Sequence, residues 1–258
     1  MSYPSDDENR PGNNGENDVP EFLSDEVFGQ VLEQALSVVQ EKTQPPGNRL
    51  DAIRFIIDQF ESKFFPILEG ILNDETEHPD VRSAAALALG KVGGDGALNA
   101  LMAHVDSHDV TVKNYSLQAL GILGREEGIP PLLEALEDGN NTIFASAAQA
   151  LGEIGKPAVP HLIHLLDPKE ADVRDDARCV AAWQLGKMKY AEAIPALLKS
   201  IATLENIEVK ALSIWALGEI GVATAEVLET LKRAKVDPDN AISERATMAM
   251  HKITRYLN

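Results

Sequence analysis

The dipeptide Leu-Gly recurs along this chain at nearly constant spacing, and this recurrence constrains the fold more than any other feature. Successive copies are offset by 31, 31, 34 and 32 residues: Leu89-Gly90, Leu120-Gly121, Leu151-Gly152, Leu185-Gly186 and Leu217-Gly218. A period of about 32 residues is typical of one helical hairpin copied in tandem. Because one hairpin cannot bury its apolar side alone, we expect a stack in which every unit covers its neighbour.

Each copy contains the same two-helix pattern. A helix rich in small residues opens eight residues before each Leu-Gly pair, and eight residues are about two turns, which places both positions on one face. A second helix follows, and its start is usually marked by a proline, which the first turn tolerates: Pro66, Pro130, Pro160 and Pro195. In the fourth copy, residues 172–174 repeat the opening signature four residues early, so we expect a first helix there that is longer by one turn.

Glycine inside a helix costs about 1 kcal/mol relative to alanine, so its recurrence after each leucine indicates a repeated geometric need. The need is either close approach of two helices or helix termination in the left-handed conformation. Packing is the interpretation that we favour.

The first residues of the chain differ from the rest. Residues 1–20 are polar and acidic, and we expect a disordered tail there. Residues 21–48 predict an N-terminal helix, with apolar residues at three- and four-residue spacing up to Val39, followed by a linker. Residues 49–258 contain the repeats. The predicted fold class is therefore all-α, a right-handed α-solenoid of about six helical hairpins with an N-terminal capping helix.

Charge and cysteine content limit the function classes. The chain has 41 acidic and 23 basic residues and a formal net charge of −18, which disfavours a nucleic-acid partner. A single cysteine excludes an internal disulfide, and no long apolar run predicts a membrane span. We therefore expect a soluble, cytoplasmic protein. No catalytic set, phosphate loop or CxxC pair can be identified, so no catalytic, metal or cofactor-binding residue is predicted.

The segments VRSAAALALGKVG (81–93), ARCVAAWQLGKM (177–188) and VKALSIWALGEIG (209–221) resemble the HEAT-like repeats of the phycobilisome-lyase family. The resemblance covers roughly residues 49–254. That family includes the E- and F-type subunits that attach or detach phycobilins on phycocyanin α chains, a protein that assists phycobilisome breakdown, and a HEAT partner of A-type iron–sulfur carriers. The run AAWQLG at 181–186 is similar to the AAWWLG run of the E-type lyases, with Gln184 at the second tryptophan.

Two groups of residues are candidates for partner binding. In HEAT-type solenoids we expect the second helices to line the concave side, so a row on those helices would form the floor of a groove: Ala103, Glu134, His164 and Lys199, with His104 and His161 nearby. Trp183 and Trp215 lie 32 residues apart at equivalent positions, so the indoles could form a shared exposed patch. Core packing is the alternative for both indoles.

Other residues have a structural and a functional interpretation. His161 and His164 could share a metal ion, or could simply occupy the polar side of their helix. Cys179 could be a nucleophile or an iron–sulfur ligand, although a buried structural thiol is commoner. Basic residues at the heads of the first helices predict a ladder of ion pairs or carbonyl hydrogen bonds, which Phe144 interrupts: Arg82, Lys113, Arg178 and Lys210. Deoxyhypusine hydroxylase, a di-iron enzyme built from similar repeats, would need His-Glu pairs as iron ligands. None of the six histidines here is followed by glutamate, so the sequence argues against that enzyme class.

The repeats predict a protein-binding scaffold that docks a partner protein to assist its assembly, modification or turnover. The resemblance implies that the partner is one of three kinds of protein: a phycobiliprotein subunit, a second HEAT-repeat subunit or an iron–sulfur carrier. The alternative is a subunit of a heterodimeric phycobilin lyase, whose pocket a second HEAT protein completes. We expect no stand-alone enzymatic activity.

Overall fold

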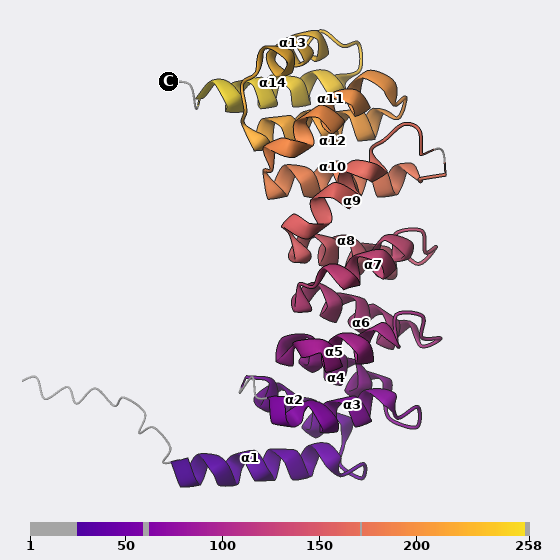
Figure 1. The fold of residues 1–258 in the computed structure, drawn as a ribbon, viewed down its shortest axis with the longest axis vertical. Helices are drawn as coiled ribbons and strands as arrows, with labels where there is room; N and C mark the ends of the chain where they lie inside the picture. The colour runs from indigo at the N-terminus through magenta and orange to yellow at the C-terminus, as the bar shows by residue number, and fades with distance from the viewer. Residues whose placement is uncertain (1–24, 59–61, 171, 256–258) are drawn as a thin grey trace, which may run out of the picture.

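A computed structural model describes residues 25–58, 62–170 and 172–255, and its helices form one elongated stack (Figure 1). Every regular element within these ranges is a helix, which confirms the all-α repeat fold. The predicted tail, residues 1–20, lies outside the described residues. The α-helices are α1 (Asp25–Gln40), α2 (Pro46–Ile57), α3 (Phe65–Asn73), α4 (Pro79–Val92), α5 (Gly94–Met102), α6 (Val110–Leu123), α7 (Ile129–Ala135), α8 (Asn141–Ile154), α9 (Val159–Leu165), α10 (Asp175–Met188), α11 (Ile194–Thr203), α12 (Ile207–Ile220), α13 (Ala225–Ala234) and α14 (Asn240–Arg255).

Short 3-10 helices precede the second α-helix of four of the hairpins. They span η1 (Ser62–Phe64), η2 (Glu126–Gly128), η3 (Lys156–Ala158) and η4 (Ala191–Ala193), and each leads directly into α3, α7, α9 or α11. Proline occupies the first turn of each of these four α-helices, as the sequence predicts.

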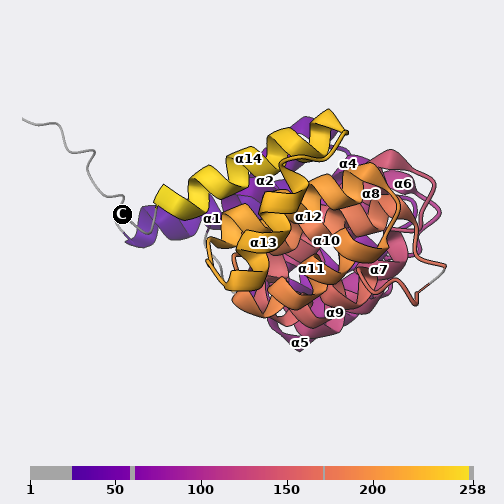
Figure 2. The same cartoon turned by 90° about the horizontal axis from the view of Figure 1, so that it is seen from above.

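The helices form two layers, which Figure 2 shows from above, with α4, α6 and α8 toward one side and α5, α9 and α13 toward the other. The five Leu-Gly helices and α14 contact their neighbours in the same layer closely along the stack, and only the contact between α8 and α10 is sparse. Helices of the second layer contact one another at few points. A stack whose layers differ in spacing must curve toward the closer layer. We therefore call the Leu-Gly helices and α14 the inner layer, and α3, α5, α7, α9, α11 and α13 the outer layer.

The core lies between the layers. The leucine of each Leu-Gly pair is buried, and so is the residue eight positions before it: Val81, Val112, Ile143, Ala177 and Val209. This confirms that both positions share one face. Burial of a leucine or valine side chain stabilises the fold by about 1.5–3 kcal/mol, so each hairpin depends on its neighbours.

The prediction of a longer first helix in the fourth repeat is wrong. Helix α10 has 14 residues, the same length as α4, α6, α8 and α12. Arg174 is extended, with φ −66° and ψ 147°, and Asp175 and Asp176 occupy the first turn, where the helix dipole favours acidic side chains. The extra residues therefore lengthen the loop between α9 and α10.

Candidate partner-binding site

The inner layer is held at close range by its glycines. Gly90 lies against Ala119, Gly121 against Ala150, and Gly218 against Ala249; a Cβ added at these glycines would come within 2.6–2.7 Å of the nearest alanine atom. Gly186 lies against Ala216 in the same way. Side chains larger than hydrogen would push the helices apart, so the packing interpretation of the recurrent glycines is confirmed.

This Gly–Ala ladder is interrupted between α8 and α10. Gly152 faces Gln184, which immediately precedes the leucine of its Leu-Gly pair and so occupies the position of Ala119, Ala150 and Ala216. The Gln184 side-chain amide is buried and donates a hydrogen bond to the carbonyl oxygen of Ala148. Helices α8 and α10 make far fewer contacts than other inner-layer neighbours. A longer side chain at the contact therefore coincides with a wider junction.

A cleft of about 840 Å³ lies at this junction. We call it the Trp183 cleft; α8 contributes Ala145, Ala148, Gln149, Gly152 and Glu153, and α10 contributes Val180, Trp183, Gln184, Lys187 and Met188. The indole of Trp183 is 40% exposed, and the Lys187 Nζ atom lies 4.8 Å above its ring centroid. An exposed tryptophan in a largely apolar hollow is the kind of residue that anchors protein partners.

The two equivalent tryptophans have different environments. Trp215 is half-buried, and its ring lies over Gly186, where an added Cβ would come within 2.7 Å of Cζ3. Trp183, in contrast, lines the cleft toward α8, and Trp215 is not one of the residues that line it. Core packing therefore describes Trp215 better, and Trp183 alone is presented at the cleft.

The predicted row on the second helices lies in the outer layer. The expectation that it lines the concave side is wrong, because the closer spacing of the Leu-Gly helices places the inside of the curve on the opposite face. Most of the row is exposed, with His104 and His161 half-buried: Ala103, His104, Glu134, His161, His164 and Lys199. Lys199 pairs with Asp167 at 2.9 Å, and a ring nitrogen of His104 lies 2.9 Å from the Ala100 carbonyl oxygen.

Three of the four basic residues predicted to form a ladder at the helix heads make carbonyl bonds or an ion pair, namely Arg82, Lys113 and Arg178. Arg82 Nε donates to the Leu72 carbonyl at 2.9 Å, and Arg178 Nη1 donates to the Leu165 carbonyl at 2.9 Å. Each arginine thus caps the C-terminal end of the preceding outer helix, where carbonyls lack helical partners. Lys113 pairs with Asp138 at 2.7 Å.

The comparisons with known proteins agree with this geometry. HEAT repeats match residues 32–121, 104–178 and 172–251. The chain belongs to the HEAT-repeat family. An archaeal HEAT-like repeats protein from Thermococcus onnurineus has the same fold, with a TM-score of 0.52 at 11% identity, covering 88% of this chain and 98% of that one.

Two curated relatives of this HEAT-repeat chain have names that refer to phycocyanin or to phycocyanobilin. An uncharacterized phycocyanin operon protein Z of Pseudanabaena tenuis is 29% identical over 51% of this chain and 68% of its own length. A phycocyanobilin lyase subunit alpha of Picosynechococcus is 33% identical over 54% of this chain and 50% of its own length. The chain thus matches only half of the lyase subunit.

A buried ion pair in the first HEAT repeats was not predicted from the sequence. Arg49 Nη1 lies 2.7 Å from Glu77 Oε1, and both side chains are at most 5% exposed. Arg49 Nε also donates to the Val39 carbonyl at 3.0 Å, so it performs at α1 the capping that Arg82 performs at α3. Burial by itself raises the pKa of Glu77, but hydrogen bonds from Arg49 and the His78 backbone outweigh it and hold the pKa below its ordinary value.

Cys179 lies half-buried on α10 of the HEAT stack. Burial, and then the negative charges of Glu208, Asp175 and Asp176, raise the pKa of its thiol to about 12. The thiol is therefore protonated at neutral pH, which favours the structural interpretation over a thiolate nucleophile or ligand.

The described residues contain neither a cluster of metal-ligating side chains nor a membrane-spanning helix. Within the described residues, no group of three or more His, Cys, Asp or Glu side chains could hold a metal ion. None of the described helices has the length and apolar character needed to cross a membrane.

Proposed function

We propose that this HEAT-repeat chain is a scaffold that docks a partner protein at the Trp183 cleft and so assists the assembly, modification or turnover of phycobiliproteins. The observation that supports this proposal most directly is the interrupted Gly–Ala ladder at Gly152 and Gln184. The interruption leaves an exposed indole in a hollow of the inner layer. The relatives whose names refer to phycocyanin and to phycocyanobilin support the choice of partner.

The physical basis for docking is the combination of a rigid stack and one accessible aromatic side chain. Large aromatic side chains bury much area at low entropy cost, and they contribute a disproportionate share of binding energy. The stack itself holds the cleft in place, because the ladder on each side of it remains closed. A preformed site of this kind favours a folded partner, since little of the scaffold needs to be ordered on binding.

A second candidate function is that of a subunit of a heterodimeric phycobilin lyase. The observation in its favour is the 33% identity to a phycocyanobilin lyase subunit alpha. In this case the Trp183 cleft would form one wall of the reaction site, and a second HEAT-repeat subunit would complete it.

Co-expression with a phycocyanin α chain and its bilin, with and without a second HEAT-repeat subunit, distinguishes the two functions. The scaffold proposal predicts a complex that co-purifies with the α chain, loses most of its α chain on Trp183→Ala, and contains no new thioether-linked chromophore on a denaturing gel. Chromophore attachment that requires this chain and a second HEAT-repeat subunit would support the lyase alternative. Absence of both complex and adduct would contradict both functions.

A further inference from the structure

The Trp183 cleft continues into a second hollow on the open face of the inner layer. This hollow has a volume of about 450 Å³, spans α8, α10 and α12, and shares Val180 and Trp183 with the cleft. Phe144 and Leu212 extend its apolar surface, and Asp138, Asp176 and Glu208 lie among its other lining residues. The surface is thus apolar along α10 and acidic near the N-terminal ends of the helices.

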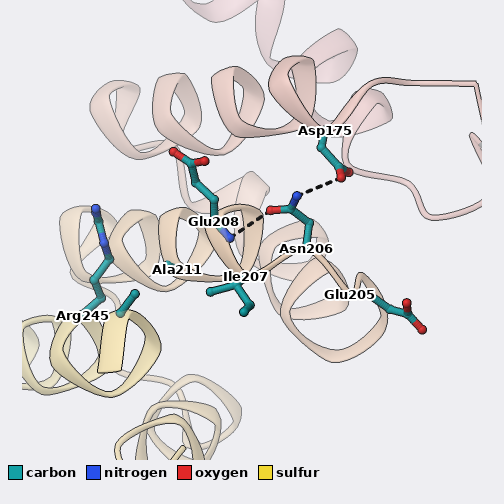
Figure 3. Close-up of a pocket in the computed structure, with 8 residues that line it drawn as sticks. Asp175, Glu205, Asn206, Ile207, Glu208, Ala211 and Arg245 are labelled. Atoms are coloured by element: carbon teal, nitrogen blue, oxygen red, sulfur yellow. Dashed lines mark hydrogen bonds between the residues drawn. The ribbon is translucent and has the colours of Figure 1, made fainter. Parts of the chain in front are cut away.

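A third hollow of about 790 Å³ follows along α12 and α14 and shares Glu208 with the second (Figure 3). Its apolar part includes Ile207, which is 48% exposed. Figure 3 shows Asn206 between Asp175 and Glu208: Asn206 Nδ2 donates to Asp175 at 2.8 Å, and the Glu208 backbone N–H donates to Asn206 Oδ1 at 2.9 Å. These bonds hold the α10 and α12 ends in register. We call the second and third hollows together the inner groove.

The inner groove has an excess of negative charge. It is lined by five carboxylates and two guanidinium groups: Asp138, Asp175, Asp176, Glu205, Glu208, Arg174 and Arg245. Lys113 pairs with Asp138 and Arg174 pairs with Asp176, whereas the described residues form no ion pair with Glu205 or Glu208. The raised pKa of Cys179, which faces the groove, is caused partly by Glu208 and is consistent with this negative potential.

Charge decides which occupant fits. A second copy of this chain also has a formal net charge of −18 and would be repelled. The chain's own residues 1–24 contain six acidic residues and one arginine, so they have the same sign as the groove. A partner that places lysine or arginine beside an apolar stripe would match both the floor and the rim of the groove.

We propose that the inner groove binds an amphipathic helix of the partner protein, with its apolar stripe against Phe144, Trp183 and Leu212 and its lysine or arginine side chains beside Glu208 and Glu205. This inference rests on the proposed function, because it defines the docked partner by its chemistry. Packed helices lie about 8–10 Å apart, so a groove that crosses from α8 to α14 has room for a helix of roughly 15–20 residues.

Fluorescence anisotropy with two labelled synthetic peptides tests the inference. One is an 18-residue amphipathic helix of leucine and lysine, and the other has glutamate at every lysine position. We expect the lysine peptide to bind the full chain and the glutamate peptide to bind at least tenfold more weakly. Glu208→Lys should weaken binding of the lysine peptide at least tenfold. The matched control, Glu134→Lys on the outer helix α7, makes the same charge change and should weaken binding less than twofold.

Several outcomes would overturn the inference. Equal losses from Glu208→Lys and Glu134→Lys would show non-specific attraction to an acidic protein, and equal binding of both peptides would remove the role of charge. Glu208 is exposed, so folding should survive; Glu208→Gln, which leaves the size unchanged, should give a smaller loss in the same direction. If the phycocyanin α chain requires Trp183 but tolerates Glu208→Lys, the proposed function stands and this inference fails. If the lysine peptide binds as predicted and the α chain does not bind, the inference stands and the phycocyanin assignment fails.

Discussion

Gly152 of α8 lies against the side-chain amide of Gln184 of α10, whereas the four equivalent glycines of the inner layer each lie against an alanine. This single difference coincides with the sparse contact between α8 and α10 and with the extra residues in the α9–α10 loop. It divides an otherwise uniform stack and exposes Trp183 at the division. The candidate site therefore arises from a departure from the repeat pattern.

The two kinds of glycine contact predict different costs for the same substitution. Gly121→Ala should destabilise the fold by about 1–3 kcal/mol, because its Cβ would come within 2.6 Å of the Ala150 Cα atom, which cannot move without the α8 backbone. Gly152→Ala should cost less than about 1 kcal/mol, because its Cβ would meet the flexible end of Gln184 and alanine is the better helix former. Urea unfolding of both variants measures the difference. Equal costs would contradict the interrupted ladder.

Lys189 ends α10 in the left-handed conformation, with φ 58°. At the equivalent position, α4, α6, α8 and α12 each end at a glycine with positive φ. Lys189→Gly should raise the free energy of unfolding by up to about 1 kcal/mol, because glycine adopts this conformation without strain. The ion pair of Lys189 with Glu219 is long, at 3.9 Å, and the lysine side chain is exposed, so the loss of this pair should matter little. Thermal unfolding checks this, with Lys189→Ala as the control that keeps the strain. A gain in the alanine variant equal to that in the glycine variant would contradict the argument.

The buried pair Arg49–Glu77 predicts a pH dependence of stability. Since the folded pKa of Glu77 lies below its unfolded value, its contribution is present above about pH 4.3 and is lost as pH falls through the folded pKa. Glu77→Gln should destabilise the fold at pH 7 by about 3 kcal/mol, because Arg49 would remain buried without its counter-charge. The variant should also lose less stability between pH 5 and pH 3 than the wild type. Denaturant titrations across this range, with the exposed Glu137→Gln as control, measure both effects.

Cys179 should react slowly with iodoacetamide. At pH 8 a thiol with a pKa of about 12 has far less thiolate than an ordinary cysteine, so alkylation of the folded chain should be at least about 100-fold slower than in urea. Glu208→Gln should accelerate the reaction, because it removes one of the charges that raise the pKa. Mass spectrometry of timed samples gives the rates. A folded-state rate close to the urea rate would mean that the thiol is neither shielded nor in a negative field.

Much of the fold follows from local sequence patterns. The Leu-Gly period and the eight-residue spacing reflect contacts that recur from one hairpin to the next, and Pro66, Pro130, Pro160 and Pro195 mark the starts of four outer helices. Such patterns predict the helices and their order. They do not determine how the chain accommodates an insertion, and so the pattern predicts a longer helix where the extra residues before Asp175 form a loop.

The site was harder to predict, because it depends on pairing between repeats. The sequence identifies Trp183 as a candidate for partner binding, and Gln184 differs from the tryptophan of the family's AAWWLG run. Only the packing of α8 on α10 shows that Gln184 takes the place of an alanine opposite Gly152. The direction of curvature likewise depends on the spacing of whole layers, which explains the misplaced row at Glu134, His164 and Lys199. The basic ladder extends back to Arg49, 33 residues before Arg82, and this spacing was a signal that could have predicted the Arg49 cap.

Isothermal titration of the purified chain with a phycocyanin α chain tests the central claim, that a partner docks on the inner layer at Trp183. We expect Trp183→Ala to weaken binding at least tenfold, while His164→Ala, on the outer helix α9, should change it less than twofold. Binding that is lost on His164→Ala and unchanged on Trp183→Ala would instead place the docking site on the outer layer.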